Sequence, residues 1–307
     1  MKNALRRPLW IVFVVLALPL AMPGQQSGGS QQAPPSLQQP NSQTGQQPAQ
    51  GQKGQAPNGQ AAAPAYQPTP DEVTTAKAIQ TELDPDRTIQ LTQDFAKKYP
   101  KSFYLGNVYL FAANAYQQKN DVAKSIEYGE KSLQLEPNSV PTLVLLTTLL
   151  PQPQDMQGTD QDKANKLKET ETDANKVLDL LKTLPKPPSA TDDQFQKIKE
   201  NITSEVHSSL GMDHEQRALM NLSGPDPAEL GKAETEYKLA VAGPQANAQD
   251  YYRLGEVYEM ENKVGEAIDA FTKSGQLGQG TMMQTLADQK IQQLKAKKPQ
   301  PTPPANH

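Results

Sequence analysis

Apolar and small residues recur with a spacing of three or four in the segment YYRLGEVYEMENKVGEAIDAFTKSGQL, residues 251–277. Residues with this spacing share one face of a helix. A polar turn at 261–264 divides the pattern, which therefore predicts two helices. The recurring positions are Tyr251, Leu254, Gly255 and Tyr258 in the first helix, and Ala267, Phe271 and Ser274 in the second.

Bulky residues in this pattern alternate with residues that have little or no side chain. Two antiparallel helices approach closely only where one of them offers a notch. Gly255 and Ala267 supply such notches, and Tyr258 and Phe271 supply the bulk that fills the remaining space. We therefore expect the two helices to pack as a pair, with Gly255 at the contact.

The same pattern occurs 142 residues earlier, in YLFAANAYQQKNDVAKSIEYGEKSLQLEP, residues 109–137. The aligned positions are Tyr109 with Tyr251, Ala113 with Gly255, Tyr116 with Tyr258, Ser125 with Ala267, and Ser132 with Ser274. Two segments that share one packing pattern indicate an internal repeat.

These segments resemble tetratricopeptide repeats, whose 34-residue unit has an aromatic residue, Leu-Gly, Tyr, Ala, Phe, Ala and Pro at set positions. The unit at 248–281 departs from that pattern at Ser274 and Gln279. The unit at 106–139 keeps small residues where they are required but has Gly129 where an aromatic is expected. The resemblance implies a solenoid of helix pairs.

Weaker helical patterns fill the rest of this region. They lie at 84–102, 140–150, 162–184, 191–242 and 280–297, and the fourth of them predicts a helix pair. The last of them predicts a terminal helix that covers the final repeat, because an uncapped solenoid end exposes its core. We therefore expect an all-α, helix-turn-helix repeat solenoid over residues 71–295.

The two ends of the chain have a different composition. Residues 1–24 combine Lys2, Arg6 and Arg7 with a short apolar run, the layout of a secretory signal peptide. The alternative is a retained membrane anchor through residues 8–22. Residues 25–70 contain 14 Gln and a single charge, and this composition predicts a disordered linker. Residues 296–307 predict a disordered tail.

Charge restricts the kinds of partner. Residues 71–294 carry 23 Lys or Arg and 34 Asp or Glu, a net charge of −11. An acidic body repels phosphate backbones, so the sequence predicts no nucleic-acid partner. The chain has no cysteine, which excludes disulfides, thiolate catalysis and Cys-based zinc sites.

Two histidines are the strongest candidates for chemistry in the predicted solenoid. His207 and His214 are seven residues apart, hence about 10 Å apart along a helix, too far to share one zinc ion. They flank Leu210 and Gly211 as Tyr251 and Tyr258 flank Leu254 and Gly255, which favours packed side chains. No catalytic arrangement is present, so we expect a protein without metal, cofactor or enzymatic activity.

In the family that the repeats resemble, the first helix of each pair lines a concave groove. The resemblance therefore implies groove positions one residue beyond the packed aromatics and on the same faces. They are Leu110, Asn114, Gln117, Val144, Tyr252, Glu256, Glu259 and Met260. The alternative for Leu110 and Val144 is packing against the neighbouring repeat. Of the two adjacent tyrosines, we expect Tyr251 in the core and Tyr252 in the groove.

These features together predict an exported, non-catalytic scaffold of the bacterial envelope, periplasmic or envelope-associated, that binds a protein or peptide in the groove. The alternative is a structural or assembly factor of the envelope. That alternative rests on layout, since a signal, a Gln-rich linker and repeats are similar to those of bacterial cell-division coordinators.

Overall fold

The computed structural model describes residues 66–243 and 246–296, and every regular element within them is an α-helix. This confirms the expected all-α fold class. The helices are α1 (Pro70–Thr81), α2 (Pro85–Lys98), α3 (Leu105–Gln118), α4 (Val122–Leu135), α5 (Val140–Leu149), α6 (Asp160–Thr183), α7 (Asp192–Leu219), α8 (Pro227–Ala242), α9 (Ala248–Met260), α10 (Val264–Leu277) and α11 (Met282–Ala296). The predicted signal peptide, most of the predicted linker and nearly all of the predicted tail lie outside the described residues.

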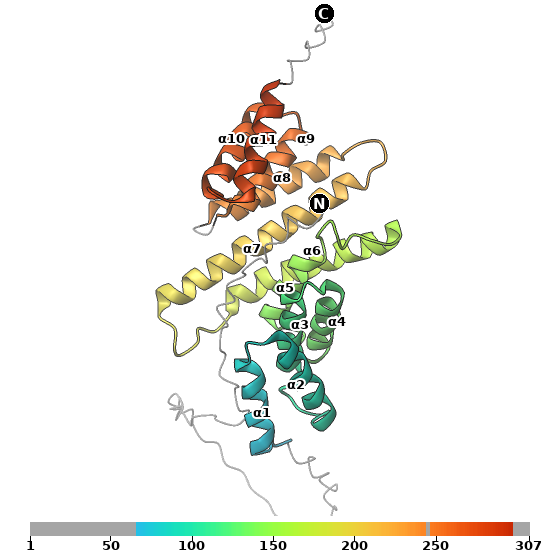
Figure 1. The fold of residues 1–307 in the computed structure, drawn as a ribbon, viewed down its shortest axis with the longest axis vertical. Helices are drawn as coiled ribbons and strands as arrows, with labels where there is room; N and C mark the ends of the chain where they lie inside the picture. The colour runs from blue at the N-terminus through green and yellow to red at the C-terminus, as the bar shows by residue number, and fades with distance from the viewer. Residues whose placement is uncertain (1–65, 244–245, 297–307) are drawn as a thin grey trace, which may run out of the picture.

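Helices that follow one another in the chain pack together, so the fold is a stack of helix pairs (Figure 1). First helices of neighbouring pairs also touch, at α1 with α3, α5 with α7, and α9 with α11. Buried apolar residues form clusters along the stack, from α1–α3 at one end to α8–α11 at the other. This arrangement is the solenoid that the repeat pattern predicts.

The turns within the two aligned pairs have the same backbone geometry. Asn120 follows α3 and Asn262 follows α9, and both have a φ of 58°. Asn tolerates this left-handed conformation better than most residues. In both turns the next amide donates to the carbonyl of the preceding tyrosine, Tyr116 or Tyr258, at 2.9 Å. The two helix ends are therefore capped in the same way.

Two glycines mark close approaches between the helices of the C-terminal pairs. A Cβ at Gly255 would lie 2.8 Å from the nearest atom of the Phe271 ring. A Cβ at Gly211 would lie 2.7 Å from the Tyr237 ring. Both rings are fully buried. Gly255 is thus a contact notch, as the sequence predicts, and the α7–α8 pair uses the same device.

Replacing Gly255 with leucine is expected to lower the free energy of unfolding by about 1–3 kcal/mol, because the new side chain enters a filled space. Gly265 in α10 is the matched control, since a Cβ there meets no atom within 4 Å. Gly265→Ala should leave stability unchanged or raise it by up to about 1 kcal/mol. Urea unfolding followed by circular dichroism measures both variants, and equal losses would contradict the notch.

Helices α6 and α7 are longer than their neighbours and cross the stack (Figure 1). They have 24 and 28 residues, whereas α9 has 13. The buried residues of α7 begin at Val206, and residues 192–205 contribute none. The buried residues of α7 therefore lie in its C-terminal half, while its first half is less buried and reaches the core through partly buried residues such as Ile202.

The folded part begins before the predicted boundary at residue 71. Tyr66, assigned from the sequence to the disordered linker, packs its ring edge-on against Phe103 with a centroid distance of 6.0 Å. Its hydroxyl donates to the buried Glu72 carboxylate at 2.5 Å. Composition missed this contact because a single aromatic residue in a polar segment gives no periodic signal.

Among the described residues, no helix combines the length and the apolar character that crossing a membrane requires. The apolar run at 8–22, on which the membrane-anchor alternative depends, lies outside them.

Candidate interaction surface

Two of the predicted groove residues are part of the core. Leu110 is 6% exposed and packs in a cluster with Tyr128 and Leu145. Val144 is 3% exposed and packs in a cluster with Val177. Both side chains hold neighbouring helices together, which is the alternative that the sequence left open for them.

Asn114 and Gln117 lie on α3 and are partly exposed. The Oδ1 atom of Asn114 is nevertheless buried and has no hydrogen-bond partner among the described residues. The structure does not bring these two residues together with the predicted positions on α9, because α5 and α7 intervene along the stack.

The remaining predicted residues gather on α9, where a lysine of α11 joins them. We call this group the α9 cluster: Tyr252, Glu256, Glu259, Met260 and Lys290. The Nζ atom of Lys290 lies 2.8 Å from Glu259 Oε2 and 3.7 Å from Glu256 Oε1. Burial, together with a neighbouring carboxylate, raises the pKa of Glu256. The lysine therefore offsets part of the negative charge on this face.

The sequence led us to expect Tyr252 in the groove. In the structure, it does not lie purely on the surface. Its ring meets the Phe271 ring edge-on, with a centroid distance of 5.1 Å, and packs against the C-terminal core. Tyr251 is also only partly buried. The two tyrosines therefore do not divide cleanly into a core and a groove residue, because the Phe271 ring that fills the Gly255 notch also reaches Tyr252.

A buried polar network lies where α7, α8 and α9 meet. The Tyr237 hydroxyl donates to Glu215 Oε2 at 2.7 Å, and Arg253 Nη1 lies 4.0 Å from the same oxygen. The Ser208 hydroxyl donates to Asp250 Oδ1 at 2.5 Å. This network connects the first helices of two successive pairs.

Burial changes the pKa values of the ionisable groups in this network. It raises the pKa of the Glu215 and Asp250 carboxyls, and the positive charge of Arg253 opposes the rise at both. Burial also raises the pKa of Tyr237, which keeps its hydroxyl protonated as the donor to Glu215. Arg253 is therefore the cation that offsets part of the cost of burying these two carboxyl groups.

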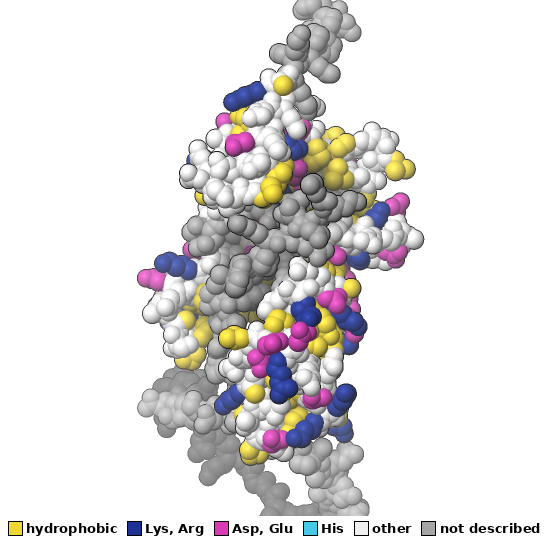
Figure 2. Space-filling model, in the orientation of Figure 1, with side chains coloured by type: hydrophobic (Ala, Val, Ile, Leu, Met, Phe, Trp, Pro, Cys, Tyr) yellow, Lys and Arg dark blue, Asp and Glu magenta, His cyan; other side chains and the backbone are white. Residues whose placement is uncertain are grey.

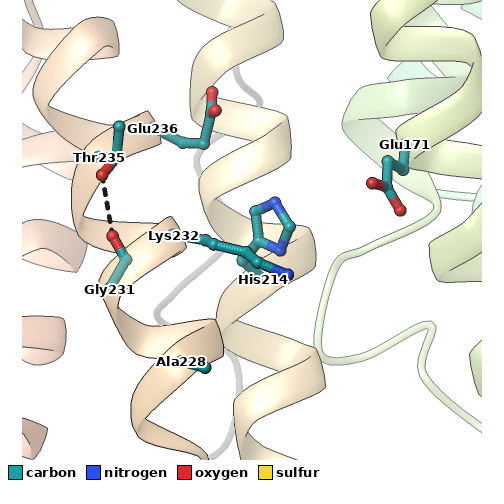
Figure 3. A pocket seen from close by; sticks show the side chains of 7 residues that line it. All are labelled: Glu171, His214, Ala228, Gly231, Lys232, Thr235 and Glu236. Carbon is teal, nitrogen blue, oxygen red and sulfur yellow. Dashed lines mark hydrogen bonds between the residues drawn. The ribbon is translucent and has the colours of Figure 1, made fainter.

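An outer pocket of about 400 Å³ opens between α6 and α8 (Figure 3). It is lined by Glu171, His214, Ala228, Gly231, Lys232, Thr235 and Glu236. His214 projects from α7 toward α8, and Glu171 faces it from α6. The pocket is therefore lined mainly by polar and charged groups.

The two histidines singled out from the sequence both bind carboxylates of α8. His207 Nδ1 lies 2.7 Å from Glu236 Oε2, and His214 Nδ1 lies 2.7 Å from Glu229 Oε2. No group of three potential metal ligands exists among residues 66–243 and 246–296. The histidines are thus packed, hydrogen-bonded side chains of the α7–α8 interface.

Asp213 on α7 is fully buried beside this interface. One oxygen accepts a hydrogen bond from Arg217 Nε at 2.7 Å, whereas Oδ1 has no partner among the described residues. Burial raises the pKa of Asp213 to about 6, and the Arg217 charge counteracts only part of that rise. The folded protein therefore retains a proton on Asp213 at pH values where the unfolded chain has released it.

We expect the free energy of unfolding to fall as the pH rises from about 4 through about 6, by an amount on the order of 1–3 kcal/mol from Asp213. The sign follows because the folded state binds the extra proton across this range. Urea unfolding at several pH values and constant ionic strength measures the slope. The Asp213→Asn variant should have a shallower slope than the wild type, and an unchanged slope would contradict this assignment.

Lys290, Arg253 and Glu215 were not singled out from the sequence. The repeat pattern ranks positions by size and apolar character, and it assigns no partner to a charged residue. One indication for Arg253 is present in the sequence, namely its position. It directly precedes the packed residues Leu254 and Gly255, and so lies on a helix with little exposed surface.

Charged side chains of both signs are interspersed on the visible face of the N-terminal helices (Figure 2). Ion pairs of the N-terminal helices include Lys98 with Asp71 at 2.6 Å and Lys131 with Glu127 at 2.7 Å. These pairs are exposed, so each contributes little to stability. The charges of this face therefore give no direct indication of a partner.

Comparison with known proteins finds no matching family profile and no matching curated protein. Among solved structures, the chain is similar to a thermophilic TPR protein from Thermus thermophilus. The identity is 13%, the TM-score is 0.46, and the match covers 72% of this chain and 99% of the other. It is also similar to the TPR domain of P58(IPK), with 13% identity and a TM-score of 0.28 over 73% of this chain and 64% of the other.

Structural similarity at these TM-scores does not indicate the function of this chain. The fold class rests instead on this chain's own helix pairs, on the equivalent Asn turns and on the glycine notches described above.

Proposed function

We propose that this protein is a non-catalytic scaffold that binds a segment of another protein on the first-helix face of its solenoid. The α9 cluster is the observation that supports the proposal. Tyr252 and Met260 are only partly buried, and they lie beside Glu256 and Glu259 on one helix that is fixed by the core. Aromatic and methionine side chains framed by polar groups are typical of protein interfaces.

The proposal includes a location in the bacterial envelope. Its support is the sequence of residues 1–24, in which three basic residues precede a short apolar run. A scaffold of this kind holds its partner outside the cytoplasm.

Photo-crosslinking in cells tests the binding surface. A benzophenone amino acid placed at position 252 of the full-length chain should capture a partner, whereas the same group at Leu239 should not. Leu239 is the matched control because it is half-exposed on α8, a second helix.

Purified partner then measures the contribution of the side chain. Tyr252→Ala should weaken binding by about 5- to 150-fold, because it removes a large rigid contact. It should also lower the free energy of unfolding by about 1–2 kcal/mol, because Tyr252 packs on Phe271. Leu239→Ala should change neither quantity. Normal binding by Tyr252→Ala, or capture only from position 239, would overturn the proposed surface.

A further inference from the structure

We propose that the α9 cluster takes a basic partner, namely a segment in which Lys or Arg residues lie next to an apolar side chain. This inference rests on the proposed scaffold function and deepens it, because it names the chemistry that the first-helix face recognises. The support comes from shared cations and from unpaired oxygen atoms where α7, α9 and α11 meet.

The carboxyl groups of the α9 cluster share one cation. The Nζ atom of Lys290 contacts both Glu256 and Glu259, and one lysine can neutralise only one carboxylate. Burial and the nearby Glu215 carboxylate raise the pKa of Glu256, which means that its charged form is disfavoured. An added cation therefore stabilises this group more than it would stabilise a fully exposed carboxylate.

A second shared cation lies next to the cluster, where α7 and α9 meet. Arg253 acts on both Glu215 and Asp250, and burial raises the pKa of both carboxyls despite its charge. Burial, together with the Asp250 carboxylate, also raises the pKa of Glu205 on α7 to about 7. The carboxyl groups therefore continue from the α9 cluster onto α7.

Two oxygen atoms of α7 point independently to the same kind of ligand. Glu205 Oε1 and Asn201 Oδ1 are buried and have no hydrogen-bond partner among the described residues. The two residues are four positions apart and so lie on one side of the helix. A carboxylate oxygen and an amide oxygen both accept hydrogen bonds, so the group that pairs with them supplies N–H donors. Both residues keep some exposure, which gives an incoming side chain access.

The apolar part of the proposed ligand follows from Tyr252 and Met260. Both are partly buried and lie on the same helix as Glu256 and Glu259. A small cation would pair with the carboxyl groups but would leave these two side chains without a contact. A protein segment with basic and apolar residues meets both requirements, and charge complementarity of this kind decides which partner a surface accepts.

A defined peptide tests the preference with the full-length protein at pH 8, where Glu205 is largely ionised. The probe is an acetylated and amidated fluorescent peptide that repeats Arg-Ser-Leu-Ser, and its counterpart has Glu in place of Arg. Fluorescence anisotropy at constant ionic strength measures both affinities. The arginine peptide should bind at least about 10-fold more tightly. Equal affinities, or no binding of either peptide, would overturn the basic partner.

Glutamine substitutions locate the binding. Glu205→Gln combined with Glu256→Gln keeps the shape of both side chains and removes their charge, so the arginine peptide should bind about 5- to 30-fold more weakly. The control, Glu266→Gln with Asp269→Asn, makes the same change of net charge at two exposed positions of α10. It should leave the affinity within about 2-fold of the wild type. Equal effects would mean that the peptide responds to net charge alone, and the site would then be wrong.

Removing the cation of the cluster gives a test that misfolding cannot imitate. Lys290→Gln takes away the lysine that Glu256 and Glu259 share, so the arginine peptide should bind about 2- to 5-fold more tightly. Lys273 is an exposed lysine of α10, and Lys273→Gln should have no such effect. Unchanged or weaker binding by Lys290→Gln would contradict the proposal.

The photo-crosslink at position 252 separates this inference from the scaffold function. A captured segment that carries Lys or Arg beside an apolar residue agrees with both. Capture of a segment without basic residues keeps the scaffold and overturns the basic partner, whereas no capture overturns both.

Discussion

Replacing Phe271 with alanine is expected to lower the free energy of unfolding by about 3–5 kcal/mol. The Phe271 ring is fully buried, fills the notch at Gly255 and meets Tyr252 edge-on. Its removal leaves a cavity at the centre of the last helix pair, and the glycine opposite has no side chain that can move into it. Thermal and urea unfolding followed by circular dichroism measure the loss.

Leu277 is the control for Phe271, because it lies in the same helix and is half-exposed. Leu277→Ala should change the free energy of unfolding by no more than about 0.5 kcal/mol. Similar losses for the two variants would mean that the buried aromatic contact of Phe271 does not contribute more to stability than a half-exposed position of the same helix.

Replacing Arg253 with methionine is expected to cost about 3–5 kcal/mol at pH 8, since it leaves the Glu215 and Asp250 carboxylates buried without a cation. Burial raises the pKa of both carboxyls, so the variant should recover part of its stability as the pH falls and they take up protons. Urea unfolding at pH 8 and pH 5 measures the cost and its recovery.

Two further variants sharpen this test. Arg253→Met combined with Glu215→Gln should be more stable than Arg253→Met alone, because one of the uncompensated charges is gone. Arg87, which is exposed on α2, serves as the control, and Arg87→Met should stay within about 0.5 kcal/mol of the wild type. A cost below about 1 kcal/mol for Arg253→Met at pH 8 would show that this arginine does not neutralise the network.

The sequence predicted the helix pairs because their packing is local. Gly255 and Phe271 lie in two helices of ordinary length that one short turn joins. Their spacing in the sequence therefore places them opposite each other. The structure shows the same notch at Gly211, although α7 and its turn are longer there and Tyr237 takes the place of Phe271.

The Asn turns were available in the sequence at the same 142-residue offset as the aligned aromatics. Asn is common in loops, so these two residues predict no particular turn, and their left-handed conformation becomes evident only from the backbone. At Gly129, where an aromatic was expected, a Cβ would lie 2.8 Å from Leu146 of α5, so a side chain from the next pair occupies that space.

The candidate surface was less predictable than the fold. Leu110 and Val144 were indistinguishable from groove residues by position, and only the closeness of the following helix decides that they are buried. The pairing of Lys290 with α9 depends on how α11 covers the last pair, and spacing within a repeat carries no information about this. Charged contacts between helix pairs can be predicted only when the superhelical arrangement of the pairs is known.

Helix α7 has one hydrogen-bonded backbone but two kinds of surroundings, with no buried residue before Val206 and a packed face after it. The energy that resists opening comes mainly from buried contacts, so it is distributed unevenly along this helix. We therefore expect the first turns of α7 to fray from Asp192 more readily than the second half, which packs against α8, can open. Hydrogen exchange should then be faster in the first turns of α7 than after Val206, which places the boundary between two local stabilities within one helix rather than at a loop.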